Sequence, residues 1–167
     1  MFWPRKYPRN FCLVSGKGLD REELVAFDNA LINAGISDYN LLKVSSILPV
    51  GAVLNRYLKL KKGSALLTAY SSICSSAPGE LLATAVAVGI PSNPKDVGVI
   101  MEMEKSFSGV NTDAISFEGK CRAEVKDMAK RAMQNHKIDC ADILTSSISG
   151  VVGNDGYLCL ISAVCLW

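Results

Sequence analysis

The stretch Lys43-Val44-Ser45-Ser46-Ile47-Leu48-Pro49 is a short apolar strand that carries two adjacent serines and stops at a proline. Three other Ser-Ser pairs occur, at 71–72, 75–76 and 146–147, so adjacent serines alone carry little information. The pair at 45–46 differs in its setting: Asn40-Leu41-Leu42 precedes it, Ile47-Leu48-Pro49 follows it, and an acid-bearing amphipathic helix is predicted just upstream. We interpret Ser45-Ser46 as a candidate self-cleavage site and work outward from it.

The length of 167 residues and a hydrophobic content of 49% predict one domain, residues 1–167, with a substantial core. The net charge is only +2, and no basic stripe interleaved with aromatic residues occurs. The densest basic cluster, Lys59-Leu60-Lys61-Lys62, is typical of a solvated loop. We therefore expect no nucleic-acid partner.

Six cysteines, at positions 12, 74, 121, 140, 159 and 165, form no Cys-x-x-Cys pair. Several lie inside apolar runs, as Cys159 does, which is typical of small core residues in a reducing compartment. His136 and Cys140 are one helical turn apart, but no second ligand pair is near them in the sequence. We therefore expect no metal site.

The N-terminal segment 1–10 is basic but is not followed by a continuous apolar stretch of the signal-peptide kind. The longest mostly apolar segments, 81–90 and 157–167, are shorter than the roughly 18 residues that a membrane span requires. These features predict a cytoplasmic protein without a membrane-spanning segment.

An amphipathic helix is predicted upstream of the serine pair. The acid-x-x-Glu spacing of Asp20-Arg21-Glu22-Glu23 is typical of a helix start, and Gly35 supplies a stop. Its expected apolar stripe consists of Leu24, Phe27, Leu31 and Ile32. Asp28 falls within this stripe, where an unpaired carboxylate would be costly to bury. Either the helix is turned so that Asp28 reaches water, or the carboxylate awaits a cationic partner.

The remaining elements are mostly strands. We expect a strand at 11–15 with a turn at 16–18, a central strand at 40–48, a strand at 64–70, an antiparallel pair at 81–90 and 97–104, and a final hairpin of 141–152 and 157–167 turning at 153–156. A loop at 107–116 precedes a second helix, 118–137, whose core face is Val125, Met128, Ala129 and Met133. This order predicts an α+β antiparallel sandwich of two sheets with a helix on each outer face.

Two carboxylates lie on the expected strand 97–104. Glu102 and Glu104 are two residues apart, so they point to the same face of a pleated strand. Such a pair marks either a solvent-facing side or an acid set in a cleft.

Four segments together resemble one known family. They are Ala26–Ile36, Asn40–Pro49, Ala77–Glu80 and Val99–Glu104. In this order and at these separations they are similar to the pyruvoyl-dependent arginine decarboxylases of the small archaeal and bacterial type. The likeness extends from about Cys12 to Trp167.

The resemblance implies a four-layer α-β-β-α sandwich and a homotrimer, or a dimer of trimers, with active sites between subunits. It also implies self-cleavage after Ser45 into a β chain, 1–45, and an α chain, 46–167. In this reaction the Ser46 hydroxyl attacks the Ser45 carbonyl, and β-elimination followed by hydrolysis leaves a covalent pyruvoyl group at position 46. Asn40 would assist processing by stabilising the oxyanion.

The implied activity is decarboxylation of L-arginine to agmatine and CO2, a feeder step for polyamines. The substrate amine would form a Schiff base with the pyruvoyl ketone, which accepts the electrons released as CO2 departs. Glu102 would be the general acid, with its pKa raised by burial and, by our inference, by Glu104. Asp28 would bind the guanidinium, while Leu24 and Leu31 would contact the aliphatic part of arginine.

Two alternatives remain open at this point. Ser37 and Tyr39 stand where the family suggests small or aliphatic residues, so the same chemistry could act on another amino acid. A second possibility is an uncleaved, non-catalytic paralogue that serves as a binding or partner subunit. The presence of Ser45, Ser46, Asn40 and Glu102 together favours an active enzyme.

Overall fold

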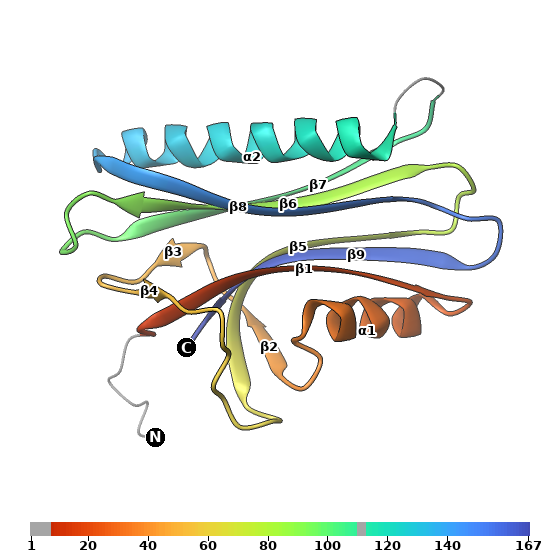
Figure 1. The fold of residues 1–167 in the computed structure, drawn as a ribbon, viewed down its shortest axis with the longest axis horizontal. Helices are drawn as coiled ribbons and strands as arrows, with labels where there is room; N and C mark the ends of the chain where they lie inside the picture. The colour runs from red at the N-terminus through yellow and green to blue at the C-terminus, as the bar shows by residue number, and fades with distance from the viewer. Residues whose placement is uncertain (1–7, 110–112) are drawn as a thin grey trace.

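The computed structural model of this protein describes residues 8–109 and 113–167. The described part forms four layers, with helix α1 (Glu23–Ala34) below one sheet and helix α2 (Ala114–Asn135) above the other (Figure 1). The expected α+β fold, an α-β-β-α sandwich of mainly antiparallel sheets, is confirmed. Residues 1–7 lie outside the described part, so the expectation drawn from the N-terminal segment stays a prediction.

The two sheets differ in size. Sheet A has the order β2 (Asn40–Lys43), β5 (Ala65–Ser75), β9 (Tyr157–Leu166), β1 (Asn10–Asp20) and β4 (Val53–Leu54). Sheet B has the order β3 (Ile47–Leu48), β7 (Gly98–Phe107), β6 (Leu81–Pro91) and β8 (Cys140–Val151). The long strands of both sheets pair antiparallel, and the short edge strands β2 and β4 pair parallel to β5 and β1.

The prediction of one central strand at 40–48 is wrong, because this stretch is divided between the two sheets. β2 forms one edge of sheet A, β3 forms one edge of sheet B, and the chain crosses between them at Val44–Ser46. We call Val44–Ser46 the crossing segment. It places Ser45-Ser46 at the side of the sandwich, outside both ladders.

The expected hairpin at the C-terminus is also wrong. β8 pairs with β6 in sheet B, whereas β9 pairs with β1 and β5 in sheet A, so the turn joins the two sheets. β9 is buried over nearly its whole length, and a strand that is apolar on both faces needs a central position in a sheet. Pairing β9 with β8 alone would leave its other edge uncovered.

Helix α1 packs on β1 through small residues rather than through the expected leucine stripe. β1 runs straight through Gly16 and Gly18, where a turn was expected, and a Cβ atom there would lie 2.2 and 2.1 Å from carbonyl oxygens of the helix. This close approach buries Ala26 and Ala30, and it leaves Leu24 79% and Ile32 56% exposed. The stripe prediction therefore holds only for Phe27 and Leu31, which are half-buried.

The helix ends follow local capping chemistry. The capping box expected for α1 does not form, because the Asp20 carboxylate accepts the Glu22 N–H at 3.0 Å and the helix begins later, at Glu23. Gly35 ends α1 as expected, with a left-handed φ of 76°. The sequence therefore predicted the end of α1 at Gly35 correctly, but it did not predict where either helix begins.

Helix α2 starts earlier than expected because Asp113 caps it, accepting the Ser116 N–H at 2.9 Å. Its buried face consists of Phe117, Cys121, Val125, Ala129 and Met133, whereas Met128 is only half-buried. Residues 110–112 of the expected loop lie outside the described part. Over 8–109 and 113–167, no helix is both long and apolar enough to cross a membrane.

A row of hydroxyl groups crosses the core between the sheets. Ser15 Oγ lies 2.8 Å from both Ser162 Oγ and Ser146 Oγ, and Ser162 Oγ lies 2.9 Å from Thr84 Oγ1. We call these four residues the hydroxyl belt. It joins two strands of sheet A to two strands of sheet B, and apolar clusters lie on either side of it. Each belt hydroxyl has a partner, as buried polar groups require.

The cysteine prediction needs one correction. Cys74 of β5 and Cys159 of β9 are direct partners in the antiparallel ladder and form a disulfide. Of the free cysteines, Cys12, Cys121 and Cys165 are buried as expected, and Cys140 is exposed. Sequence spacing missed the bond because the two residues are 85 positions apart and only strand pairing brings them together.

Candidate active site

The crossing segment holds Ser46 in an uncommon backbone conformation. Its φ is 67°, in the left-handed region that side chains other than glycine rarely adopt and that is costly to maintain. Two contacts hold the residue in place. The Ser46 carbonyl accepts the Ile100 N–H at 2.8 Å, and the Ser46 hydroxyl donates to Glu102 Oε2 at 2.8 Å.

Strand pairing explains why these residues meet. β3 pairs with β7 so that Ile47 lies opposite Val99, which places the preceding Ser46 beside Ile100. Glu102 follows two positions later on the same face of β7. The structure thus joins Ser46 and Glu102 across 56 positions of sequence.

The Glu102 carboxyl lies in a mixed electrostatic environment. Burial raises the pKa of Glu102 above its ordinary value, and the nearby Glu104 adds a smaller effect in the same direction. The hydrogen bond from Ser46 and the charge of Lys43 lower the pKa of Glu102 again. Because burial is the largest of these effects, the carboxyl holds a proton more readily than an exposed glutamate does.

The other Ser-Ser pairs lie in regular strands or at a strand end. Ser71-Ser72 lies within β5, Ser146-Ser147 lies within β8, and Ser75 is the last residue of β5. Two of these serines also donate to carboxylates, Ser147 to Glu118 at 2.8 Å and Ser75 to Glu80. Apart from Ser46, Lys137 is the one residue other than glycine with positive φ in the described part of the chain. Backbone conformation therefore singles out Ser46 among these serines.

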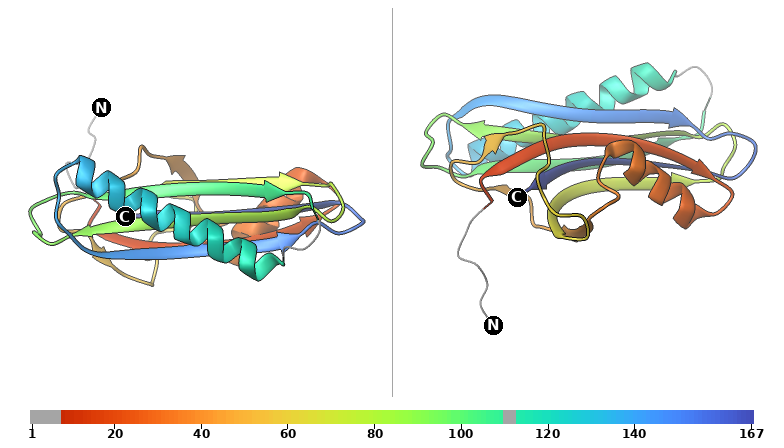
Figure 2. Two further views of the ribbon diagram at one scale, coloured as in Figure 1. Left: turned by 90° about the horizontal axis from the view of Figure 1, so that it is seen from above. Right: turned by 60° about the horizontal axis from the view of Figure 1, so that its bottom comes forward.

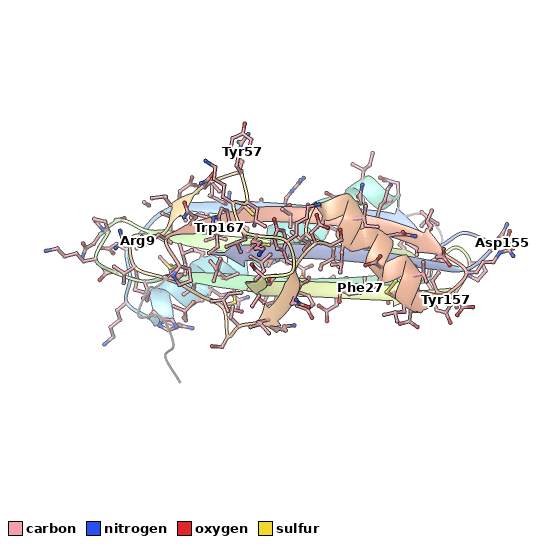
Figure 3. All side chains as sticks on the ribbon, turned by 90° about the horizontal axis from the view of Figure 1, so that it is seen from below. Arg9, Phe27, Tyr57, Asp155, Tyr157 and Trp167 are labelled. Carbon is pink, nitrogen blue, oxygen red and sulfur yellow. A yellow bond between two sulfur atoms is a disulfide. The ribbon has the colours of Figure 1, made fainter. Side chains whose placement is uncertain are left out.

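The expected substrate-binding residues lie elsewhere in this chain. Asp28 is exposed on α1, which covers the outer face of sheet A, whereas Ser46 contacts sheet B (Figures 1 and 2). Of the two orientations left open for Asp28, the structure has the one in which the carboxylate reaches water. A groove beside it is lined by Glu23, Leu24, Phe27, Ser72 and Cys74, and Figure 3 labels Phe27 on this helix. Leu31 is half-buried against the same face of sheet A.

Asn40 does not contact the serine pair within this chain. Its side-chain amide donates to the Gly63 carbonyl at 2.8 Å, at the start of β2. Asn40 begins β2 and Ser45 lies beyond the end of this strand, so the length of β2 separates the two residues. One chain therefore brings Ser46 and Glu102 together but leaves Asn40 and Asp28 apart from them.

Sequence reasoning missed Lys43 near this site. Its ammonium lies 4.7 Å from the centre of the Tyr70 ring, and its charge acts on Glu102. The available signal was its position, three residues before Ser46 at the end of β2. Lys43 thus adds a positive charge to the surroundings of Glu102, where it opposes the effect of burial on the pKa of that carboxyl.

Comparison with a solved structure defines the class of fold. The chain is similar to a structure titled as a pyruvoyl-dependent histidine decarboxylase at pH 8, with a TM-score of 0.53, covering 65% of this chain and 52% of that one. The sequence identity is 16%, so this likeness concerns the fold alone. The sandwich therefore has the same kind of fold as that structure.

Sequence comparison identifies the family. The model of the pyruvoyl-dependent arginine decarboxylase family matches residues 10–167, and the chain belongs to this family. Proteins with that name from Methanococcus vannielii and Methanocaldococcus jannaschii are 32% and 34% identical to it, covering 99% and 97% of this chain and 94% and 92% of theirs. The relative from Methanococcus aeolicus is 35% identical, over 98% of this chain and 93% of its own. The resemblance noted from four segments is thus confirmed.

Proposed function

We propose that this chain cleaves itself between Ser45 and Ser46 and then decarboxylates L-arginine to agmatine and CO2. In the first step the Ser46 hydroxyl attacks the Ser45 carbonyl, so that the peptide bond is replaced by an ester. Elimination then frees the carboxylate of the β chain, 1–45. The dehydroalanine left on the α chain, 46–167, takes up water and loses ammonia to give the pyruvoyl group.

The geometry of Ser46 is the observation that carries this proposal. Its hydroxyl donates to Glu102 at 2.8 Å, so the carboxylate is placed to accept the proton released during attack. The left-handed backbone at Ser46 is costly in the intact chain, and cleavage of the peptide bond removes that constraint.

Processing also changes the state of Glu102. The Ser46 hydroxyl lowers the pKa of Glu102 in the intact chain, and this hydrogen bond disappears when Ser46 becomes the pyruvoyl group. The pKa of Glu102 then rises, since burial dominates. The same carboxyl can therefore accept a proton before cleavage and, in the mature enzyme, donate one to the α-carbon of the substrate.

Membership of the arginine decarboxylase family supports arginine as the substrate. The pyruvoyl group supplies a carbonyl that accepts the electrons left behind by departing CO2. Asp28 would bind the guanidinium through two parallel hydrogen bonds, since its carboxylate is exposed. Leu24 and Leu31, which flank Asp28 on α1, would contact the aliphatic part of arginine.

A second copy of the chain is needed to complete this site, because sheet A separates α1 from the crossing segment. We expect a homotrimer, or a dimer of trimers, in which α1 of one subunit approaches Ser46 of its neighbour. Exposed apolar side chains support an interface on this stretch of chain. Leu42 and Ile47 flank the crossing segment, and the chain that continues to β4, at the other edge of sheet A, exposes Val50, Val53, Leu54 and Tyr57. Figure 3 shows Tyr57 projecting away from the sandwich, and its side chain is 76% exposed. Asn40 would assist processing across the same interface.

An intact-mass spectrum under denaturing conditions tests self-cleavage. We expect two chains that divide after Ser45, with a pyruvoyl mass in place of Ser46 at the start of the larger chain. A single stable species of 17.9 kDa would instead support the non-catalytic paralogue.

The substrate is tested separately with the variant Asp28→Asn. Loss of activity on arginine is expected, because a neutral amide cannot form the charged pair with guanidinium. Unchanged preference for arginine would favour the same chemistry with a different specificity residue. Mass analysis in parallel shows whether the variant still cleaves itself.

A further inference from the structure

Each long strand of sheet A contributes one serine to the space between the sheets. The three serines are direct neighbours in the ladders: Ser15 of β1, Ser162 of β9 and Ser71 of β5. The first two belong to the hydroxyl belt and contact β8 and β6 of sheet B. Ser71 lies next to the belt, and its hydroxyl donates to the Met103 carbonyl of β7 at 2.8 Å. This row of serines thus ends on the strand that carries Glu102.

The contact between Ser71 and Met103 requires the two sheets to lie close together. Packed sheets are usually about 10 Å apart, which is more than one serine side chain can span. Ser71 is 2% exposed, so water does not compete for its hydroxyl. Among the residues that the structure describes, this is the one hydrogen bond that joins sheet A to β7.

The part of β7 that receives this bond has a free edge. On one side β7 pairs with β6 over nearly its whole length. On the other side β3 covers only Gly98 and Val99, and the crossing segment binds the amide of Ile100. No described strand pairs with this edge over 101–107. A strand with one open edge is displaced more easily than a central strand, so a contact from sheet A has more effect here.

The surroundings of Glu102 depend on the position of this strand. Glu102 lies opposite Val86 of β6, which is buried between the sheets, so the Glu102 side chain is on the inner face of sheet B. Burial has the largest effect on the pKa of Glu102 and raises it. The Ser46 hydroxyl and Lys43 lower this pKa, and Glu104 raises it further. Movement of β7 away from sheet A would admit water to the carboxyl.

We propose that Ser71 is a positioning residue for Glu102: its bond to the Met103 carbonyl holds the free edge of β7 against sheet A and keeps the Glu102 carboxyl sheltered. The inference rests on the proposed catalytic role of Glu102. A carbonyl oxygen accepts hydrogen bonds but carries no proton, so Ser71 acts through the position of the strand and not as a proton donor. The contact is with the backbone, so it also operates after Ser46 has become the pyruvoyl group.

The test compares Ser71→Ala with Ser162→Ala, because each removes one buried hydroxyl and only the first removes a contact with β7. We expect Ser71→Ala to lower kcat per mole of cleaved protein about 2- to 10-fold, the factor that a lost hydrogen bond corresponds to, with KM for arginine within about 2-fold of wild type. The fall of kcat at high pH should begin at lower pH, because water lowers the raised pKa of Glu102. Ser162→Ala should lose similar stability in urea and keep the wild-type kcat and pH profile.

Hydrogen exchange tests the same contact without reference to decarboxylation. The segment 101–107 should exchange about 2- to 10-fold faster in Ser71→Ala than in the wild type, since its local opening becomes easier. The same segment should exchange at the wild-type rate in Ser162→Ala, which contacts β6 and not β7.

Three results would overturn the assignment. Unchanged exchange of 101–107 in Ser71→Ala would mean that this hydroxyl does not hold the edge of β7. A lower kcat with an unmoved pH profile, or equal losses of kcat in both variants, would mean that Ser71 only supports the fold. A wild-type protein that fails to decarboxylate arginine would instead refute the proposed function, and the exchange of 101–107 would still decide whether Ser71 holds β7.

Discussion

The hydroxyl belt and the crossing segment use the same side chain in opposite ways. Ser15 and Ser162 lie in regular strands, and their hydroxyls pair with each other at 2.8 Å. Ser46 lies between two strands with a φ of 67°, and its hydroxyl pairs with Glu102. The belt serines have neutral hydrogen-bond partners and lie in regular strands. Ser46 has an acidic partner, and its backbone is in the strained left-handed region.

This difference supports Ser46, rather than a serine of the belt, as the nucleophile of the proposed cleavage. A neutral hydroxyl partner satisfies a hydrogen bond but is a poor acceptor for the proton of serine. A carboxylate accepts that proton, and a left-handed backbone raises the free energy of the intact peptide. Ser75 and Ser147 also donate to carboxylates, Glu80 and Glu118, but they lie in regular strands. The combination of an acidic partner with a left-handed backbone therefore distinguishes Ser46.

The largest expected effect comes from removing the reactive hydroxyl. Ser46→Ala should abolish both cleavage and decarboxylation, because neither the nucleophile nor the pyruvoyl group can form. Intact mass and CO2 release measure the two losses. Ser162→Ala removes a hydroxyl of the belt and should leave cleavage intact. Two chains in the Ser46→Ala spectrum would refute the assigned nucleophile.

The next effect concerns the acidic partner. Glu102→Gln should lower kcat by about 100-fold or more, the usual contribution of a general acid or base. Cleavage should also slow, since the amide cannot accept the Ser46 proton. Turnover is therefore measured per mole of cleaved protein, after long incubation. A kcat equal to that of the wild type would remove Glu102 from the chemical step.

A substitution in the hydroxyl belt should lower the free energy of unfolding and leave cleavage and turnover unchanged. Ser162→Ala leaves the buried hydroxyls of Ser15 and Thr84 without this partner, and an unsatisfied buried polar group costs about 1–3 kcal/mol. Urea denaturation measures this loss as a lower midpoint with an unchanged slope. Ser92→Ala, in the exposed turn after β6, should change stability by less than about 0.5 kcal/mol. Equal stability of both variants would mean that the belt does not hold the sheets together.

The smallest effect is a shift in pH dependence. Glu102 donates a proton only while it is protonated, so kcat should fall as pH rises through its raised pKa. Glu104 is the smallest of the effects on this pKa and raises it, so Glu104→Gln should move this limb of the kcat profile to slightly lower pH. Asp155→Asn, in an exposed loop at the far end of the sandwich, should not move it (Figure 3). A shift to higher pH in Glu104→Gln would contradict the assigned like-charge effect.

Much of the fold was predictable because local signals agreed with it. The antiparallel pair of β6 and β7, the glycine that ends α1 and the body of α2 all follow from periodicity and turn residues. The expected turn at Gly16 and Gly18 was wrong, because these glycines serve the close approach of α1 and not a change of direction. A Gly-x-Gly sequence is compatible both with a turn and with the close approach of a helix to a strand. Only the tertiary packing distinguishes these two uses.

For the candidate site, too, some features could be predicted from the sequence and others could not. The sequence by itself determined the family, and it predicted the serine pair, Glu102 and Asp28 as site residues, because both inferences depend on residue identities at set separations. Only the tertiary structure decided that 40–48 crosses between sheets, that β9 leaves β8 for the centre of sheet A, and that Ser46 is left-handed against Glu102. These features depend on which strands become neighbours. That choice is made by burying β9 on both faces and both edges, and short-range sequence patterns do not encode it.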